Sequence, residues 1–296
     1  MRTASNWKDY VILGTSDGEK LEKWGKVSLV RPDPQIIWKT DRHDPLWTGA
    51  DGHYHRSNKG GGEWEFRKRL PESWKISYGA LTFIIRPTGF KHTGLVPEQA
   101  VNWDFMAEKI RGAGREINVL NLFAYTGGAT LACAEAGANV CHVDASKGMV
   151  QWARDNAALN GLQDRPIRWI VDDVHKFLRR EFRRERRYDA VILDPPTFGR
   201  GASGETYKIE RDLQETLTLV KGVLSEKPRF ILFSSHTPGL SCQVAENILA
   251  QHFPTARVES GEMLLEGAGR PCPSGIYCRA VFEDAGRDKR DRSRVW

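Results

Sequence analysis

The sequence predicts an α/β protein in which a small β-rich region precedes a larger domain built on a mostly parallel sheet. Up to about residue 90, short apolar runs are separated by Pro, Gly, Asp and Asn, and none shows a long helical pattern. After about Thr88, strand-like runs alternate with helix-length segments. Repeated β-α units of this kind form a parallel sheet with helices on both faces. We therefore expect two domains, over residues 1–90 and 91–296.

Length and composition set broad limits on the class of protein. The 296 residues fit one large domain, or a medium domain with a small one, and a hydrophobic fraction of 40% is enough for a substantial core. No apolar stretch approaches the roughly 20 residues of a membrane-spanning helix, and the first residues do not have the pattern of a secretory signal. A net charge of +6 is compatible with a polyanionic partner.

The cysteines indicate a reducing compartment. There are 5, an odd number, and no two of them form a CxxC pair. This pattern argues against a disulfide framework and against a structural zinc site, and we expect a cytoplasmic protein. His53 and His55 lie close together in the sequence, but two histidines alone are too few ligands for a metal, so we predict no metal site.

The order of expected elements follows the apolar runs. In the β-rich region the expected strands are Val27–Val30, Ile36–Trp38, Glu63–Phe66, Trp74–Ile76 and Leu81–Ile85. In the second region the expected strands are Val119–Phe123, Asn139–Val143, Ile167–Val171, Tyr188–Leu193, Phe230–Ser234, Ala256–Gly261 and Ile276–Phe282. The helices between them are expected over 128–136, 147–160, 208–224 and 241–252, with another following Asp173.

The residues just after the first strands of the second region indicate a ligand. In an open parallel sheet, ligands bind outside the carboxyl ends of the strands. Thr126, Gly127 and Gly128 form a tight turn after the first strand, and Asp144 ends the second, where a carboxylate can accept both hydroxyls of a ribose. Asp172 and Asp173 follow the third strand, within reach of an adenine amino group. A nucleoside ligand fits this pattern, although the glycines alone would also be explained by a turn.

A dinucleotide enzyme has a similar layout and is the first competitor. Its fingerprint is GxGxxG. Here the turn reads Thr126-Gly127-Gly128-Ala129-Thr130-Leu131, which does not match. A small nucleoside ligand without a pyrophosphate is therefore favoured, and an NAD-dependent oxidoreductase is the weakest alternative.

Taken together, these motifs resemble the class I S-adenosylmethionine-dependent methyltransferases over about residues 91–282. The resemblance implies a Rossmann-like, seven-stranded methyltransferase sheet. The stretches "KHTGLVPEQAVNWDFM", "NLFAYTGGATLACAEAGA", "VDASKGMVQWARDNAALNGL" and "LDPPTFGRG" are similar to bacterial enzymes that methylate 23S ribosomal RNA, of the guanine-N7 and cytosine-C5 types.

The resemblance implies cofactor contacts for particular residues. Asp144 would hold the ribose, Asp194 would lie near the methionine amino group, and Asp173 would face the adenine. Asp172 is the alternative for the adenine, with Asp173 then capping the next helix. The complete expected set for S-adenosyl-L-methionine is Thr93, Gly94, Gln99, Phe123, Ala124, Thr126, Gly127, Asp144, Ser146, Asp172, Asp173 and Asp194.

The loop "DPPTF" is the predicted catalytic segment. Pro195 and Pro196 have a fixed φ and no N–H, so they leave free carbonyls on a stiff backbone beside Asp194. Phe198 can stack on a flat base. In the related enzymes that methylate planar nitrogens, this loop receives the target. The alternative is a simple strand-ending turn with Phe198 packed in the core.

Carbon methylation would require a different residue. Cytosine C5 becomes nucleophilic only after a thiolate adds to C6. The cytosine-C5 relatives carry that cysteine after the fifth strand, where this sequence has Ser235 in "FSSH". We therefore favour methylation of a base nitrogen. A small-molecule or protein methyltransferase, or an RNA-binding protein that has lost catalysis, remains the alternative.

The expected partner is RNA, and 23S ribosomal RNA in particular. The stretch "HYHRSNKGGGEWEFRKR" mixes cations with aromatic rings, a mixture that suits single-stranded RNA. Arg56, Lys59 and Arg67 are its candidate contacts, and a sheet edge protected by charge is the alternative. The basic helix "HKFLRREFRRERR" is a second candidate, although such a run is usually a solvated face. The sequence does not predict an oligomeric state.

Overall fold

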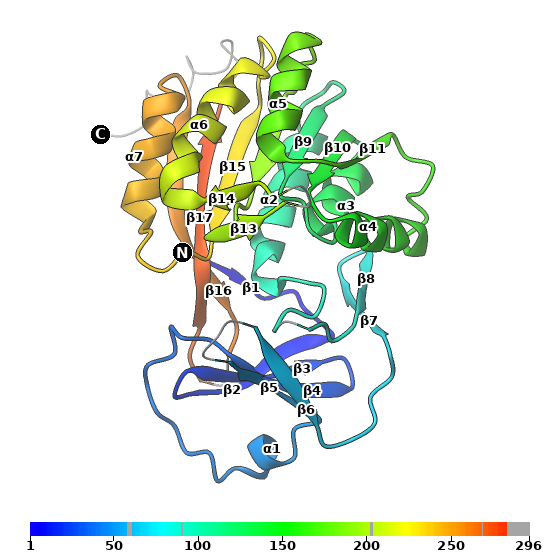
Figure 1. Ribbon diagram of the computed structural model, residues 1–296, viewed down its shortest axis with the longest axis vertical. Helices are drawn as coiled ribbons and strands as arrows, with labels where there is room; N and C mark the ends of the chain where they lie inside the picture. The colour runs from blue at the N-terminus through cyan, green and yellow to red at the C-terminus, as the bar shows by residue number, and fades with distance from the viewer. Residues whose placement is uncertain (58–60, 90, 202–203, 268, 283–296) are drawn as a thin grey trace, which may run out of the picture.

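The computed structural model describes residues 1–57, 61–89, 91–201, 204–267 and 269–282. It consists of a large α/β domain and a smaller β-rich part that lies below it in Figure 1. Among the described residues, no helix is long and apolar enough to cross a membrane.

The large domain is built on an eight-stranded sheet of order β1-β16-β17-β15-β12-β9-β10-β11. All neighbours in it are parallel except β17, which is antiparallel to both β15 and β16. The strands are β1 (Arg2–Ala4), β9 (Asn118–Leu122), β10 (Asn139–Asp144), β11 (Ile167–Val171), β12 (Ala190–Leu193), β15 (Phe230–Ser235), β16 (Arg257–Leu265) and β17 (Cys272–Val281). The seven predicted strands are all present, and the N-terminal β1 adds an eighth by pairing with β16.

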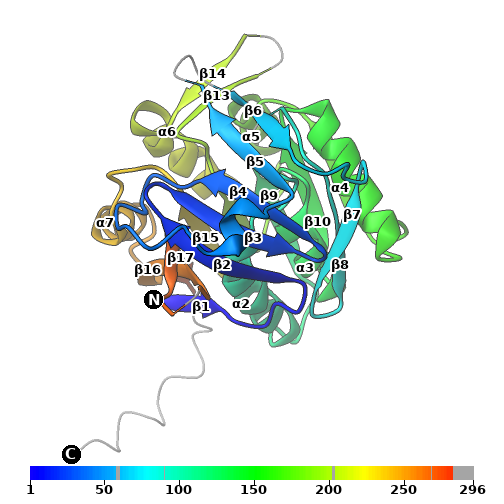
Figure 2. The same ribbon diagram turned by 90° about the horizontal axis from the view of Figure 1, so that it is seen from below.

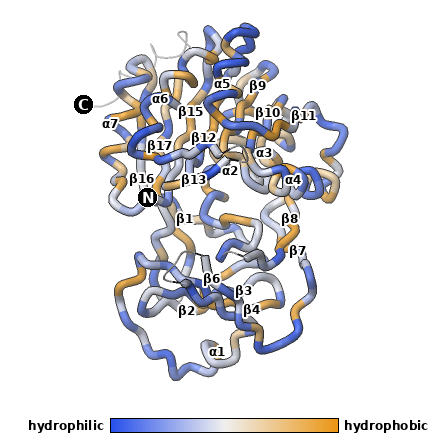
Figure 3. Tube along the Cα trace, in the orientation of Figure 1, coloured by the Kyte–Doolittle hydropathy of each residue, from blue (hydrophilic) through white to orange (hydrophobic). Residues whose placement is uncertain are grey.

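Within the described ranges, six helices cover the two faces of this sheet. They are α2 (Ala100–Arg111), α3 (Gly128–Glu135), α4 (Lys147–Leu159), α5 (Val174–Arg183), α6 (Ile209–Gly222) and α7 (Cys242–His252). Alternate residues of each central strand enter separate cores: Ala190 and Ile192 pack with α2 and α3, whereas Val191 and Leu193 pack with α5, α6 and α7. The helices accordingly show hydrophobic and hydrophilic colours along their turns in Figure 3.

The β-rich part contains a five-stranded sheet of order β2-β3-β4-β5-β6, a separate β7–β8 hairpin and a short helix. The elements are β2 (Tyr10–Ser16), β3 (Glu19–Trp24), β4 (Val27–Pro32), α1 (Pro45–Thr48), β5 (Gly52–Arg56), β6 (Gly62–Phe66), β7 (Trp74–Tyr78) and β8 (Leu81–Ile85). Figure 2 shows the hairpin beside α4. There the Asn156 and Asn160 side chains of α4 accept hydrogen bonds from the backbone of β8.

Buried charges connect the β-rich sheet to the large domain. Glu22 is fully buried and forms an ion pair with Arg31 at 2.6 Å. Arg31 also donates to the backbone carbonyl of Lys91. The first 90 residues are thus joined to the rest through these contacts, through the β7–β8 hairpin and through β1. The division at residue 90 stays a prediction.

Several local features differ from the expectations. Ile36–Trp38 was expected to be a strand and is irregular: it follows Pro32 and Pro34, and its carbonyls accept from the Asp17–Gly18 turn. Elements that were not predicted include β1, β2, β3, α1, β5, α2 and the short hairpin of β13 (Phe198–Arg200) and β14 (Thr206–Lys208).

Candidate active site

The loop after β9 has an unusual backbone. Phe123, Tyr125 and Gly127 all have positive φ, at 55°, 50° and 88°. A left-handed conformation costs a residue with a side chain about 1–2 kcal/mol, so the surrounding structure must hold it. The Ala124 N–H donates to the Val143 carbonyl, and the Tyr125 N–H donates to Asp144 Oδ2 at 2.8 Å. The end of β10 therefore fixes the shape of this loop.

Asp144 stands at the centre of these contacts. One carboxylate oxygen accepts from Tyr125 N–H and the other from Ser146 N–H, so each can still accept a second hydrogen bond. The side chain is half-buried, and this burial raises the pKa of Asp144 above its ordinary value. Ser146 is exposed and caps α4 by accepting from the Met149 N–H.

The glycines around this loop are required by packing. A Cβ at Gly127 would come 2.9 Å from Ala153 of α4, and one at Gly128 would come 2.8 Å from Trp103 of α2. Gly94, with φ of 96°, would clash at 2.1 Å with Trp152. These contacts explain by packing alone why glycine is required at each position, without reference to a ligand.

The segment before α2 closes over the same loop. The Thr126 hydroxyl donates to the Gly94 carbonyl at 2.6 Å, and the neighbouring Thr93 is fully buried. The Thr93 hydroxyl has no hydrogen-bond partner among the described residues. The structure thus brings Thr93 and Gly94 to the β9 loop, as the sequence predicts, and leaves one buried hydroxyl for another group.

The two acids after β11 have different environments. The Asp173 carboxylate caps α5 by accepting from Lys176 N–H at 2.9 Å. Asp172 forms an ion pair with Arg180, and its backbone N–H donates to the Asp144 carbonyl. Asp173 therefore caps the next helix, which was the alternative expectation, and the contact of either acid with an adenine stays a prediction.

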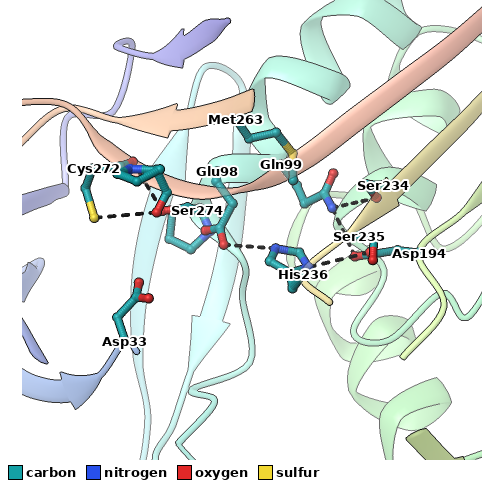
Figure 4. A network of polar contacts seen from close by, with 12 residues as sticks. Asp33, Glu98, Gln99, Asp194, Ser234, Ser235, His236, Met263, Cys272 and Ser274 are labelled. Atoms are coloured by element: carbon teal, nitrogen blue, oxygen red, sulfur yellow. Dashed lines mark hydrogen bonds and ion pairs between the residues drawn. The ribbon is translucent and has the colours of Figure 1, made fainter. Parts of the chain in front are cut away.

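Asp194 lies at the end of β12 in a polar network (Figure 4). Gln99 donates to Asp194 Oδ2 at 3.0 Å and to the Ser234 hydroxyl at 2.9 Å. The Gln99 carbonyl in turn accepts from Asn102 of α2. Gln99 therefore joins the segment before α2 to the ends of two adjacent strands.

His236 continues this network on the other side of Asp194. Its Nδ1 lies 3.6 Å from Asp194 Oδ1, and its Nε2 lies 3.1 Å from Glu98 Oε1 (Figure 4). Burial would lower the pKa of His236, but the Asp194 and Glu98 carboxylates outweigh it and raise the pKa to about 10. Burial likewise opposes ionisation of Glu98, yet His236 and Lys20 lower its pKa to about 2. At neutral pH this histidine is a cation and cannot accept a proton.

The proline loop presents its aromatic side chain to solvent. Pro195 is buried and Pro196 half-buried, whereas Phe198 is 55% exposed. The Arg200 guanidinium lies 5.7 Å from the Phe198 ring centre. The alternative in which Phe198 packs in the core is therefore wrong, and the ring is available for stacking.

A family model described as S-adenosylmethionine-dependent methyltransferase matches residues 43–225, which is more than half of the chain. The chain belongs to this methyltransferase family. The solved structure of a SAM-dependent methyltransferase from Agrobacterium tumefaciens is 34% identical, with a TM-score of 0.90 over 95% of this chain and 93% of that one. Another methyltransferase, solved with S-adenosylhomocysteine, is 19% identical and shares the fold, with a TM-score of 0.74 over 94% of this chain and 76% of that one.

Curated relatives of this methyltransferase carry the name ribosomal RNA large subunit methyltransferase K/L. The protein from Syntrophotalea carbinolica is 31% identical over 67% of this chain, and that from Shewanella baltica is 35% identical over 53%. The matched segments cover 28% and 21% of those proteins, so the chain corresponds to about a quarter of their length.

The thiols of this methyltransferase are poorly suited to nucleophilic attack. Four of the five cysteines are buried, and Cys242, the first residue of α7, is half-buried. Burial raises the pKa of every one, to about 11 for Cys141 and Cys272 and about 12 for Cys278. Ser235, which takes the expected cysteine position, is buried and accepts a hydrogen bond from Thr237 N–H.

A cavity of about 640 Å³ is lined in part by His236. Its lining comes from the loop after β15, from strands β16 and β17, and from Gln35 of the β-rich part. His236 and Thr237 border it, and Thr237 reaches the proline loop through a 2.9 Å hydrogen bond to Thr197. The cavity therefore adjoins the loop on which the acceptor is expected.

The predicted RNA contacts that the structure describes lie at the ends of strands β5 and β6. Arg56 is exposed at the end of β5, and Lys59 lies outside the described residues. Arg67 is also exposed, but its guanidinium donates to the carbonyls of Trp47 and Thr48 at the end of α1. In the basic helix, Lys176, Arg179 and Arg180 form ion pairs with acidic side chains.

The sequence predicted Gln99 at this site but not Glu98, and it did not predict how these two residues pair with the ends of the strands. Glu98 is separated from His236 by 138 positions and Gln99 from Ser234 by 135. Nothing in the local sequence indicates these contacts, although Glu98 and Gln99 both lie in the stretch that carried the family resemblance.

Proposed function

We propose that this methyltransferase transfers a methyl group to a ring nitrogen of a base in ribosomal RNA. The observation that carries the proposal is the arrangement at the end of β12: Asp194 is held by Gln99 and His236, with the exposed Phe198 four residues further on. Such a site combines a fixed carboxylate with a platform for a flat acceptor.

The residues of the β9–β10 edge fit S-adenosylmethionine. Asp144 has free acceptor capacity for two ribose hydroxyls, and the buried Thr93 hydroxyl makes no hydrogen bond to any residue that the structure describes. We assign Phe123, Ala124, Thr126 and Gly127 to the amino-acid end, Asp172 to the adenine and Asp194 to the amino group. When bound, the cofactor supplies an electrophilic methyl group on a sulfonium.

Nitrogen is favoured as the acceptor because it needs no covalent catalyst. An unprotonated ring nitrogen has a lone pair, so positioning it in line with the methyl group supplies much of the catalysis. Carbon C5 would need a thiolate, and burial raises the pKa of all five thiols. The chain's own contribution is to orient the base with Phe198 and the Pro195–Pro196 backbone.

RNA as the substrate, and the cytoplasm as the location, rest on the names of the relatives and on the motifs of the proline loop. The cavity is lined in part by His236, which pairs with Asp194, and we infer that a flipped base enters there. A small-molecule or protein substrate is the alternative, because a cavity of about 640 Å³ also suits a free small molecule.

The decisive experiment is mass spectrometry of ribosomal RNA from a strain lacking the gene. We expect one methylated nucleoside to disappear and to return with the wild-type gene but not with Asp194→Ala. An unchanged methylation pattern would contradict a ribosomal target. Loss of 5-methylcytosine would contradict nitrogen as the methyl acceptor. Calorimetry with S-adenosylhomocysteine and with NAD tests the cofactor separately.

A further inference from the structure

A group of metal-binding side chains gathers on the β-rich sheet, away from the active site. His53 and His55 are two residues apart on β5 and so share one face of the sheet, while Tyr54 between them is buried on the other. On the neighbouring strand β6, Glu65 pairs directly with His53. The register therefore places two imidazoles and a carboxylate side by side.

The distances between these groups are short enough for a shared ion. One ligand atom from each of His53, His55 and Glu65 lies within 4.8 Å of the other two. His55 Nε2 is 2.8 Å from Glu65 Oε2, and the two imidazole rings have centres 4.0 Å apart. Three ligands bound to one Zn²⁺ at about 2.0–2.2 Å lie within about 4 Å of one another, so only small adjustments are needed.

A second carboxylate orients one of the histidines. Glu19 Oε1 lies 2.6 Å from His53 Nε2, and its other oxygen accepts from Arg42 at 2.7 Å. Arg42 is itself held over the Trp47 ring, with the guanidinium carbon 4.6 Å from the ring centre. Histidine ligands of metals usually have such a carboxylate partner, which fixes the ring orientation.

We propose that His53, His55 and Glu65 form a Zn²⁺ site with its remaining position open to water. Two imidazoles with one carboxylate are a ligand set typical of zinc, and the half-exposed position gives the ion a path of entry. The bound ion would tie the edge strand β6 to β5 and so stabilise the hairpin. The site was not predicted, because the sequence offers only the two histidines at recognisable spacing; Glu65 joins them through strand pairing.

The test is zinc binding by the full chain after treatment with a chelator. Calorimetry with ZnCl₂ should give one equivalent of tight binding, and Zn²⁺ should raise the unfolding temperature. Co²⁺ should give the visible absorption of a tetrahedral site. We expect His55→Ala and Glu65→Gln each to lower zinc affinity more than 100-fold, and Glu19→Gln to lower it about 10- to 100-fold.

His43→Ala is the matched control, because it removes an exposed imidazole outside the cluster. It should bind zinc as the wild type does. Unchanged binding of S-adenosylhomocysteine and an unchanged circular dichroism spectrum would show that each variant is folded. Equal zinc affinity in the wild type and in the His53→Ala/His55→Ala double variant, or a wild-type Kd weaker than about 1 mM, would overturn the site.

Discussion

The two halves of the active-site edge are built in different ways. At the ends of β9 and β10, backbone shape dominates: positive φ angles, glycines against tryptophans, and an aspartate that binds backbone N–H groups. At the ends of β12 and β15, charged and amide side chains from distant segments converge on Asp194. The ends of β9 and β10, here called the cofactor half, suit binding of the cofactor. The ends of β12 and β15, here called the acceptor half, suit the group that accepts the methyl. Variants in the two halves should therefore change cofactor affinity and the rate of methyl transfer separately.

Asp194→Asn should have the largest effect. It keeps the shape of the side chain but removes the charge that pairs with His236, beside the expected methyl donor. We expect methyl transfer to slow by on the order of 10²–10³-fold. Single-turnover rates with undermethylated ribosomal RNA measure this directly. A near wild-type rate would show that methyl transfer does not depend on the charge of Asp194.

Gly94→Ala should be the most damaging change on the cofactor half. The new Cβ would approach Trp152 to 2.1 Å at a φ of 96°. We expect a loss of about 3 kcal/mol in the free energy of unfolding, measured in urea. Gly137→Ala is the matched control, because its φ is 99° and its Cβ would meet nothing within 4 Å. Equal losses in both variants would assign the effect to backbone strain alone.

Asp144→Asn should weaken binding of the cofactor and leave the fold intact. Losing charge-assisted hydrogen bonds to ribose hydroxyls should raise the Kd for S-adenosylhomocysteine about 10- to 100-fold. Because burial raises the pKa of Asp144, wild-type affinity should also fall as the pH is lowered toward that pKa, as protonation removes the acceptor. Calorimetry at a series of pH values from 7.5 downward tests both points; a wild-type affinity that stays flat down to about pH 4, the ordinary range of an aspartate, would contradict them.

His236 should give a smaller effect that depends on pH. Its pKa is raised to about 10 in the folded protein, so its stabilising charge is fully present below pH 6.5 and is lost as pH rises through 10. The difference in unfolding free energy between the wild type and His236→Gln should therefore be larger at pH 6 than at pH 9.5. A constant difference would mean that the imidazole is not held as a cation.

Cys242→Ala should have the smallest effect. Cys242 borders the cavity beside His236, but burial raises the pKa of its thiol. Methyl transfer should stay within about twofold of wild type, because nitrogen methylation needs no thiolate. A loss of more than tenfold would restore carbon C5 as the acceptor.

The cofactor half could be predicted from the sequence because its contacts are local. The β9 loop follows its strand directly, Asp144 ends β10, and Asp173, whose capping role was the alternative expectation, comes two residues after β11. The apolar runs place those strands. The exposed position of Phe198 was also expected from the proline loop. These features are determined by short segments of the chain, and the composition and spacing of such segments can be recognised in the sequence.

The acceptor half could be predicted only in part. The pairing of Glu98 with His236 and of Gln99 with Ser234 depends on how α2 docks on the sheet, and α2 itself was not predicted. The same limit applies to Glu65, which meets His53 only through the register of β5 and β6. Long-range packing decides these contacts, and no local pattern encodes it.

Strand β1 has a consequence for how the chain is made. Arg2 to Ala4 pair with Met263 to Leu265, so β1 can find its partner only after the β-rich part and most of the large sheet have been synthesised. The methyltransferase sheet therefore cannot be completed domain by domain, even though the β-rich part can form early. Such distant pairing slows folding, because a long loop must close before the contact forms. This edge of the sheet therefore assembles only after both β1 and β16 have been translated.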